Sequence, residues 1–204
     1  MDLYAEPYDP ARPVVCFDEM PVQLIGETRT PRPAAPGRPA CIDYEYVRHG
    51  TCNVFVAVEP LRGRRQLTVT ARRTRADFAR QMQWLVDVAY PEATTIRVIL
   101  DNLNTHTAVA LYDTLPPTEA RRLLRKVEFH YTPPHGSWLN MAEIEFSVVQ
   151  RQCLARRIAD PTVLQQELAA YARQRNTMRA TITWQFTVDH ARVKLHRLYP
   201  SIPS

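Results

Sequence analysis

The sequence predicts an α/β fold in which helices flank a mixed five-stranded β-sheet. Three short apolar segments early in the chain have the composition of β-strands, at residues 14–17, 53–59 and 66–71. Amphipathic segments with helical spacing then alternate with two further apolar strands. With 204 residues, 45% of them hydrophobic, the chain is long enough for one domain with a sizeable core.

The order of the predicted strands and helices favours one kind of α/β fold. The strand at 14–17 ends at two acids, the strands at 53–59 and 66–71 form a hairpin around a turn at 60–64, and an amphipathic helix covers 74–89. The remaining elements are expected, in order, as a strand at 95–100, a helix at about 105–115, a strand at about 127–130, a long helix from about 138 and a helix at 161–175. Hairpin-connected strands followed by alternating helix and strand give the RNase H-like order. We expect a single domain over 1–204, with its core at about 12–155 and a helical extension at about 156–204.

Charge, hydropathy and cysteine spacing favour a polyanionic partner and argue against a membrane protein, a secreted protein or a zinc site. The formal net charge of +5 is carried mainly by arginine, whose planar fork binds phosphate in a bidentate manner, so a polyanionic partner is favoured. No apolar run approaches the length of a membrane span, and the first residues lack the features of a signal peptide. The four cysteines are scattered without a C-x-x-C pair, so we expect reduced thiols in a cytosolic protein.

Two predicted strands each deliver a carboxylate to their C-terminal end. Asp18 follows the first strand and Asp101 follows the strand at 95–100. Ligands bind at this edge of open α/β sheets, so the two carboxylates converge if their strands are neighbours. Converging carboxylates are suitable ligands for Mg²⁺, and without a cation they would repel each other. The alternative is that Asp101 caps the next helix, although the polar segment 101–106 (DNLNTH) is denser than a cap requires.

The helix near residue 140 offers a third acid. Its buried stripe is predicted from apolar residues at steps of three and four: Leu139, Ala142, Phe146, Val149 and Cys153. Glu143 and Glu145 flank this stripe on opposite sides, so periodicity does not choose between them. Asn140 and Glu143 also have the spacing of a capping box, which is a structural alternative for Glu143.

Four motifs make the sequence recognisable, at residues 16–19 (CFDE), 100–106 (LDNLNTH), 135–143 (HGSWLNMAE) and 184–187 (WQFT). They resemble the DDE transposases of bacterial insertion sequences, a branch of the mariner superfamily. The resemblance extends over nearly the whole chain, and the segment 136–143 is its most specific part.

This resemblance implies a catalytic domain whose active acids are Asp18, Asp101 and Glu143. The Leu-Asn-x-x-Glu pattern of the family selects Glu143 over Glu145. The same three carboxylates are implied to hold two Mg²⁺ ions, which Mn²⁺ can replace. Between Asp101 and Glu143 lie 41 residues, more than in the mariner branch, and we attribute the excess to an insertion at 116–122.

The implied activity is cut-and-paste transposition, in which transposon-end phosphodiester bonds are cleaved and the ends are joined to target DNA. The implied partners are DNA and a second copy of the chain, in a bacterial cytoplasm at the nucleoid. Family members usually carry an N-terminal helix-turn-helix region, whereas only 17 residues precede Asp18 here. We therefore expect an excised catalytic domain, the second half of a split reading frame or a degraded copy.

Basic side chains and two histidines are the expected DNA contacts. The Pro- and Arg-rich segment 28–40 should be an extended basic loop. The candidates for nucleic-acid contact are Arg29, Arg32, Arg38, Arg62, Arg64, Arg65, His106 and His135. Each arginine could instead only keep a loop soluble, and each histidine could orient a metal ligand or make a structural hydrogen bond. Trp138 is either a base-stacking residue or a core residue at the start of a helix.

Two other functions share parts of this pattern. An RNase H-like nuclease would use the same acids to cut DNA without joining it. A catalytically silent DNA-binding remnant would keep the basic surface and bind without metal.

Overall fold

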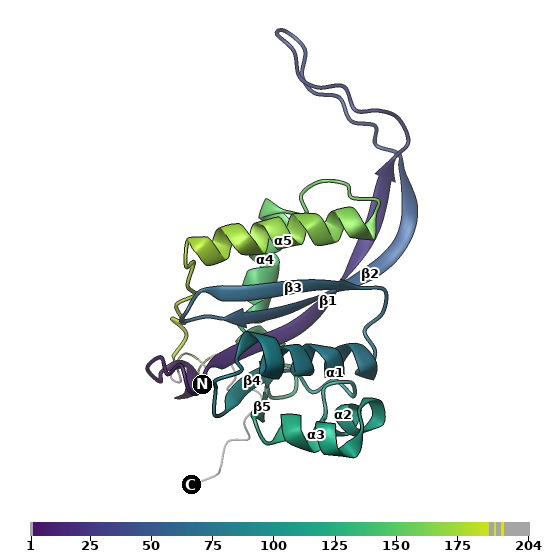
Figure 1. Cartoon of the computed structure of the whole chain (residues 1–204). Helices are drawn as coiled ribbons and strands as arrows, with labels where there is room; N and C mark the ends of the chain where they lie inside the picture. Colours follow the sequence, from purple (N-terminus) through teal and green to yellow (C-terminus); the bar gives the residue numbers. More distant parts are fainter. Residues whose placement is uncertain (1, 188–189, 191–192, 194–204) are drawn as a thin grey trace.

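A computed structural model describes residues 2–187, 190 and 193. Within them the chain forms one mixed sheet of five strands in the order β3-β2-β1-β4-β5 (Figure 1). The strands are β1 (Val14–Glu27), β2 (Tyr46–Glu59), β3 (Arg64–Thr70), β4 (Ile96–Leu100) and β5 (Val127–Tyr131). The predicted mixed five-stranded sheet and its RNase H-like order are confirmed.

Four of the strands run in one direction. β2 is antiparallel to both β1 and β3, whereas β1, β4 and β5 are parallel to one another. The C-terminal ends of β3, β4 and β5, at Thr70, Leu100 and Tyr131, therefore lie at the same edge of the sheet, which β1 crosses near Asp18. We call this edge the carboxyl edge.

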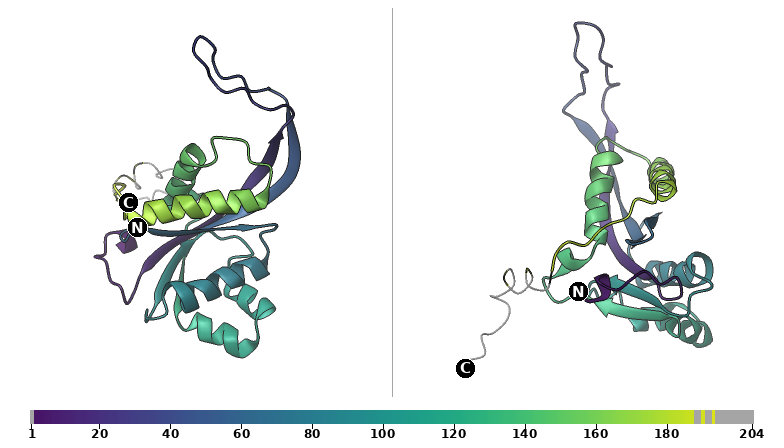
Figure 2. Two further views of the ribbon diagram at one scale, coloured as in Figure 1. Left: turned by 45° about the horizontal axis from the view of Figure 1, so that its top comes forward. Right: turned by 90° about the vertical axis from the view of Figure 1, so that its left-hand side faces the viewer.

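Helices cover both faces of the sheet (Figures 1 and 2). One face carries α1 (Arg75–Trp84), the π-helical segment η2 (Leu85–Ala89), α2 (Ala108–Thr114) and α3 (Pro117–Leu124). The other carries α4 (Ala142–Gln152) and α5 (Pro161–Thr177). Two short 3₁₀ turns, η1 (Asp2–Tyr4) and η3 (Ser137–Leu139), complete the described elements. No helix of the described residues is both long enough and apolar enough to cross a membrane.

The described residues form two hydrophobic cores, one on each face of the sheet. Alternate side chains of a strand belong to different cores. In β1, Val15 and Phe17 belong to the core beneath α1–α3, whereas Cys16 and Met20 belong to the core beneath α4 and α5. Successive strand residues point to opposite faces of a sheet. Asp18 therefore shares the face of α4, and the next residue faces α1 and α2.

The first strand is longer than the sequence predicts, so Asp18 lies inside β1 and not at its end. Asp18 pairs with Val56 of β2, and the pairing continues to Glu27. Ladder hydrogen bonds use main-chain groups, so acidic side chains do not end a strand whose partner continues. The apolar run alone therefore misplaced the end of the strand.

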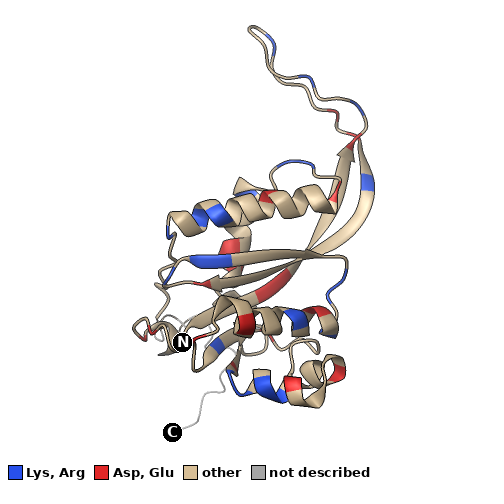
Figure 3. Ribbon diagram, in the orientation of Figure 1, with Lys and Arg blue, Asp and Glu red and all other residues tan. Residues whose placement is uncertain are grey.

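The loop between β1 and β2 projects from the body of the molecule as an arm, residues 28–45 (Figure 1). Two isolated bridges, Arg32 with Cys41 and Ala35 with Arg38, hold its two sides together. Figure 3 shows basic residues along it. The predicted extended basic loop is confirmed. The strand after it, β2, begins seven residues before the predicted start. The sequence did not indicate this part of the strand, because residues 46–51 are exposed and lack the alternating burial that marks a strand.

Two helices differ from the expected boundaries. The segment interpreted as an insertion forms α3, which starts at Pro117, where the missing N–H of proline is tolerated in the first turn. The helix expected from about residue 138 begins as the η3 turn, and α4 starts only at Ala142. The predicted stripe from Leu139 to Cys153 is buried, as expected.

Candidate active site

Asp18 and Asp101 are neighbours at the carboxyl edge. Cys16 of β1 pairs with Ile99 of β4 in parallel register, and each acid lies two residues further along the chain. Asp101 is the first residue after β4, whereas Asp18 remains within β1. The register of the central strands thus brings the two predicted acids together.

Glu143 approaches the same region from the first turn of α4, with an exposed side chain. Asn140, which is 1% exposed, fixes the start of this helix. Its side-chain amide donates to the carbonyl oxygen of Phe17 at 2.8 Å, and its Oδ1 accepts from the N–H of Ala142 at 3.2 Å. The helix that carries Glu143 is therefore tied to the residue before Asp18.

The capping-box role considered for Glu143 is not realised. In a capping box, the glutamate side chain accepts from the N–H of the cap residue. Here the N–H of Asn140 donates to the carbonyl oxygen of Ser137 at 2.7 Å, and its side chain accepts from Ala142. The carboxylate of Glu143 is consequently not needed to stabilise the helix start.

The three acids form one electrostatic cluster. Burial raises the pKa of Asp18 to about 7, and the charges of Glu143 and Asp101 act in the same direction, while a hydrogen bond from the N–H of Glu19 opposes them. Burial also raises the pKa of Glu143, and the charge of Asp101 adds to that rise. Because like charges disfavour each other's ionisation, the shifts reflect the proximity of the three carboxylates.

Asp101 is held by a histidine. Nδ1 of His106 lies 2.7 Å from Oδ1 of Asp101, and the N–H of Leu103 donates to the same oxygen at 3.3 Å. Burial acts to raise the pKa of Asp101, but the hydrogen bond and the charge of His106 outweigh it and lower that pKa. Asp101 is thus the acid of the cluster that most readily stays ionised.

Glu19 lies behind His106 on the other face of β1. Its Oε2 is 2.8 Å from Nε2 of His106, and both side chains are almost completely buried, at 0% and 1% exposed. Alternation along β1 turns Glu19 away from the face that Asp18 and α4 share. Glu19 therefore does not extend the cluster of three acids but forms a buried ion pair beside it.

The donor set fits a hard divalent cation by its chemistry. Asp18, Asp101 and Glu143 offer carboxylate oxygens, and a bound cation would relieve the repulsion that raises the pKa of Asp18. As the side chains lie, no group of three or more His, Cys, Asp or Glu among the described residues forms a complete metal site. Metal binding would therefore require the carboxylates to close around the ion.

Glu145, the alternative third acid, is used elsewhere. It is fully buried on the α5 side of α4, where Nε of Arg65 lies 2.9 Å from its Oε1. The hydroxyl of Tyr171 donates to the same oxygen at 2.7 Å. Arg65 itself is 2% exposed, so it is not available to DNA, and its prediction as a phosphate contact is wrong. The sequence of β3 did not reveal that Arg65 occupies one of its inward-facing positions.

His106 is likewise withdrawn from the predicted DNA contacts. It is 1% exposed and its ring packs against Phe78 and Phe17, with centroid distances of 5.0 and 5.8 Å. A side chain so enclosed cannot reach a phosphate from this position. Its contact with Asp101 fits the alternative role named in the sequence analysis, that of orienting a residue that binds metal.

The remaining predicted arginines fall into two groups. Arg29, Arg32 and Arg38 lie on the exposed arm, where Arg29 pairs with Asp43 at 3.4 Å. Arg62 and Arg64 lie at the turn between β2 and β3. That turn is at the opposite edge of the sheet from the acids, since β3 runs from it towards the carboxyl edge.

Arg73 is a basic residue at the acid cluster that sequence analysis missed. It follows the end of β3, its side chain is 53% exposed, and its Nη1 lies 3.6 Å from Oε1 of Glu19. Its charge also contributes to the lowered pKa of Asp101. The rule that ligands bind at the carboxyl ends of parallel strands would have identified Arg73 if it had been applied to β3 as well.

His135 and Trp138 follow β5 in a proline-rich loop. His135 is exposed and has a φ of 61°, in the left-handed region that non-glycine residues rarely adopt. Trp138 is half-buried and its ring meets Phe186 edge-on, at 5.0 Å between centroids. Trp138 therefore packs at the start of the helix region, and His135 remains accessible as a predicted DNA contact.

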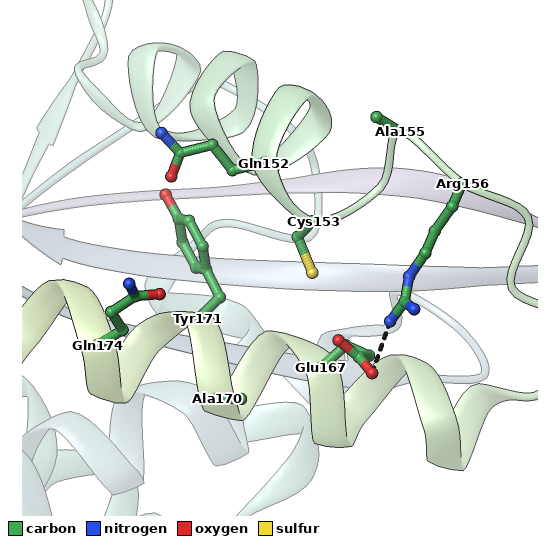
Figure 4. A pocket seen from close by; sticks show the side chains of 8 residues that line it. All are labelled: Gln152, Cys153, Ala155, Arg156, Glu167, Ala170, Tyr171 and Gln174. Carbon is green, nitrogen blue, oxygen red and sulfur yellow. Dashed lines mark ion pairs between the residues drawn. The ribbon is translucent and has the colours of Figure 1, made fainter. Parts of the chain in front are cut away.

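A cavity of about 460 Å³ between α4 and α5 lies apart from this cluster (Figure 4). Its wall includes Cys153, Tyr171 and Gln174, and an ion pair of 2.6 Å joins Arg156 to Glu167 at one side. None of the three predicted acids lines it. The acid cluster is thus not part of this cavity.

A family model described as "DDE superfamily endonuclease" matches residues 13–165. The chain belongs to this family. Asp18, Asp101 and Glu143 all lie within the matched residues. No protein of curated function matches the sequence at a significant level.

Solved structures similar to this chain include three complexes of the Mos1 transposase. The "paired-end complex with left transposon end" is 15% identical with a TM-score of 0.36, over 85% of this chain and 57% of that one. The "Mos1 mariner paired end complex with Mn" is 17% identical with a TM-score of 0.38, over 91% and 60%. The "Mos1 Strand Transfer Complex" is 15% identical with a TM-score of 0.36, over 87% and 56%. The chain thus spans less than two thirds of the length of these transposases.

Proposed function

We propose that the chain is the catalytic domain of a DDE transposase of the bacterial insertion-sequence branch of the mariner superfamily. It would cleave phosphodiester bonds at transposon ends and join the ends to target DNA in the bacterial cytoplasm. The observation that carries the proposal is the position of Asp18 and Asp101 on neighbouring parallel strands at the carboxyl edge, with the helix of Glu143 anchored to the residue before Asp18. The family match over residues 13–165 supports phosphoryl transfer as the chemistry of this cluster.

The proposed ligands of Mg²⁺ are Asp18, Asp101 and Glu143, with Mn²⁺ as a substitute. Bound ions would lower the pKa of a water or 3′-hydroxyl nucleophile and stabilise the leaving oxygen. The task of the chain itself is to hold three carboxylates at one place, on a central strand, at a strand end and on a helix. The hydrogen bond from Asn140 to Phe17 fixes the start of α4 relative to β1.

DNA is the proposed substrate and partner. Arg73 is the basic side chain best placed to contact a phosphate near the acids, because it is half-exposed beside Glu19. The arginines of the arm and His135 are accessible for further contacts. We further propose a homodimer as the working unit, since joining two transposon ends requires two cleavage sites.

The decisive experiment incubates the full chain with pre-cleaved DNA of the transposon ends, a target plasmid and Mg²⁺, and scores joined products. A transposase gives joined products that Asp18→Asn abolishes. A parallel reaction contains uncut transposon ends, and their cleavage without any joining in either reaction would instead identify an RNase H-like nuclease. DNA binding with neither reaction would identify a catalytically silent remnant.

A further inference from the structure

The main chain of His106, in the segment that follows Asp101, is held by two hydrogen bonds. The N–H of His106 donates to the carbonyl oxygen of Leu103 at 2.9 Å, and the hydroxyl of Tyr131 donates to the carbonyl oxygen of His106 at 2.8 Å. These bonds fix the main chain at His106 from both its own loop and β5. Together with the packing of the ring against Phe17 and Phe78, they restrict the positions open to the imidazole.

Within this loop, both ring nitrogens of His106 face carboxylates. Nδ1 lies 2.7 Å from Oδ1 of Asp101 and Nε2 lies 2.8 Å from Oε2 of Glu19. The ring thus joins a partly buried acid of the candidate site to a fully buried acid in β1.

Packing alone does not explain this arrangement. The ring does fill space between Phe17 and Phe78, as any aromatic residue could. A core aromatic residue, however, would remove the charged partner of Oε2. Within the described part of the chain, it would leave the buried carboxylate of Glu19 with only Arg73, 3.6 Å from Oε1, and poorly compensated buried charges are costly. The chain instead keeps a glutamate at 0% side-chain exposure directly behind the histidine that holds Asp101.

The hydrogen bonds to Asp101 use only one of its two carboxylate oxygens. Among the described residues, both donors to its carboxylate, His106 and the N–H of Leu103, reach Oδ1. The second oxygen, Oδ2, receives no hydrogen bond from them. A carboxylate held by one oxygen keeps its orientation and retains the other for a ligand.

We propose that His106, supported by Glu19, is the positioning residue that orients the Asp101 carboxylate for divalent-metal binding. Glu19 fixes the imidazole from behind, and His106 fixes Oδ1 of Asp101 from the front. His106 does not touch the DNA. This inference rests on the proposed function, because it assigns a role in the metal site of that function.

The test separates the two ring nitrogens of His106 by substitution in the full chain. His106→Asn keeps a donor close to the position of Nδ1, which faces Asp101. His106→Gln keeps a donor close to Nε2, which faces Glu19, and loses the one facing Asp101. The readouts are the dissociation constant for Ca²⁺ from calorimetry, without DNA, and the melting temperature of each variant.

We expect His106→Gln to weaken Ca²⁺ binding by about 10–100-fold, the usual effect of removing an orienting partner of a metal ligand. His106→Asn should stay closer to the wild type, although both variants lose the ring from the core and melt at similarly reduced temperatures. A purely structural histidine would give equal Ca²⁺ dissociation constants in the two variants. That result would overturn the proposal.

A second pair of variants covers the case in which the histidine variants do not fold. Glu19→Gln keeps the shape of the side chain but removes the charge behind His106, and it should also weaken Ca²⁺ binding. Glu59→Gln is the matched control, because Glu59 is 2% exposed and accepts a 2.9 Å hydrogen bond from Tyr90 at the opposite edge. Equal Ca²⁺ binding in both would overturn the proposal. A wild-type chain that binds no Ca²⁺ and joins no DNA would instead refute the proposed function itself.

Discussion

The side-chain amide of Asn140 donates a hydrogen bond to the main-chain carbonyl oxygen of Phe17 at 2.8 Å. These residues are 123 positions apart in the sequence, and each is a near neighbour of a predicted catalytic acid. One buried hydrogen bond therefore links the strand of Asp18 to the helix of Glu143. This link explains why an asparagine precedes Glu143 by three residues when no capping box is formed.

Asn140→Ala should damage both stability and activity. The change leaves the Phe17 carbonyl oxygen and the Ala142 N–H without their buried partner, at a cost of about 1–3 kcal/mol in the free energy of unfolding. Loss of the anchor lets the start of α4 move relative to β1, so the cleavage rate should fall by about 10–100-fold. Urea unfolding and single-turnover cleavage measure the two effects.

Tyr4→Phe is the control for Asn140→Ala. It removes a 2.9 Å hydrogen bond from the Tyr4 hydroxyl to the carbonyl oxygen of Leu139, at the same chain segment. The link to Phe17 remains, so the cleavage rate should change little. Equal losses of activity in the two variants would contradict a specific role for Asn140.

Glu143→Gln should leave the fold intact and abolish most of the activity. Glu143 is exposed and its carboxylate is not needed at the helix start, so its removal costs little stability. The lost negative charge removes a proposed metal ligand, and cleavage should fall by orders of magnitude, on the order of 10²–10⁴-fold. Melting temperature and cleavage rate are measured together.

Glu145→Gln should behave in the opposite way. Without the carboxylate, the buried guanidinium of Arg65 loses its countercharge, and breaking a buried pair costs about 3–5 kcal/mol of stability. At a temperature where the variant remains folded, its cleavage rate should approach the wild-type rate. A stable but inactive Glu145→Gln beside an active Glu143→Gln would move the third ligand by two residues.

Arg73→Ala should weaken DNA binding and cleavage by about tenfold, the effect of losing one hydrogen bond from a charged group. Arg62→Ala is a closely matched control. The two arginine side chains are 53% and 52% exposed, and each lies within 4.0 Å of a glutamate that is almost completely buried. Because Arg62 lies at the opposite edge of the sheet, its loss should matter less, as measured by fluorescence anisotropy and cleavage rate. A larger effect at Arg62 would place the DNA path away from the acids.

Removal of the divalent metal should stop cleavage, and its return should restore it. Mg²⁺ or Mn²⁺ should support the reaction, because the proposed ligands are all carboxylate oxygens. The larger Ca²⁺, with its longer and more flexible coordination, should support binding only. Cleavage of labelled DNA in excess EDTA, followed by re-addition of each metal, measures the dependence. Undiminished cleavage in EDTA would refute a metal-dependent site.

Local sequence patterns determined most of the elements of this fold. Apolar runs gave the cores of β1, β2, β4 and β5, and helical spacing gave the buried stripe from Leu139 to Cys153, because burial imposes a period on each. They failed where burial is absent, as in the exposed half of β2, or where acids continue a strand, as at Asp18. The motif around Asn140 favoured Glu143 over Glu145, a choice that helical periodicity alone left open.

Only the tertiary structure decided how the polar side chains are used. Arg65 and Glu145 look like surface residues in their own segments, yet they meet inside the protein because β3 packs against α5 while α4 packs against the neighbouring strands β1 and β2. Glu19 and His106 are 87 positions apart and form a pair only because β1 and the loop after β4 are adjacent. Partners of this kind depend on long-range packing, and a local pattern carries no information about which distant group will lie within about 3 Å.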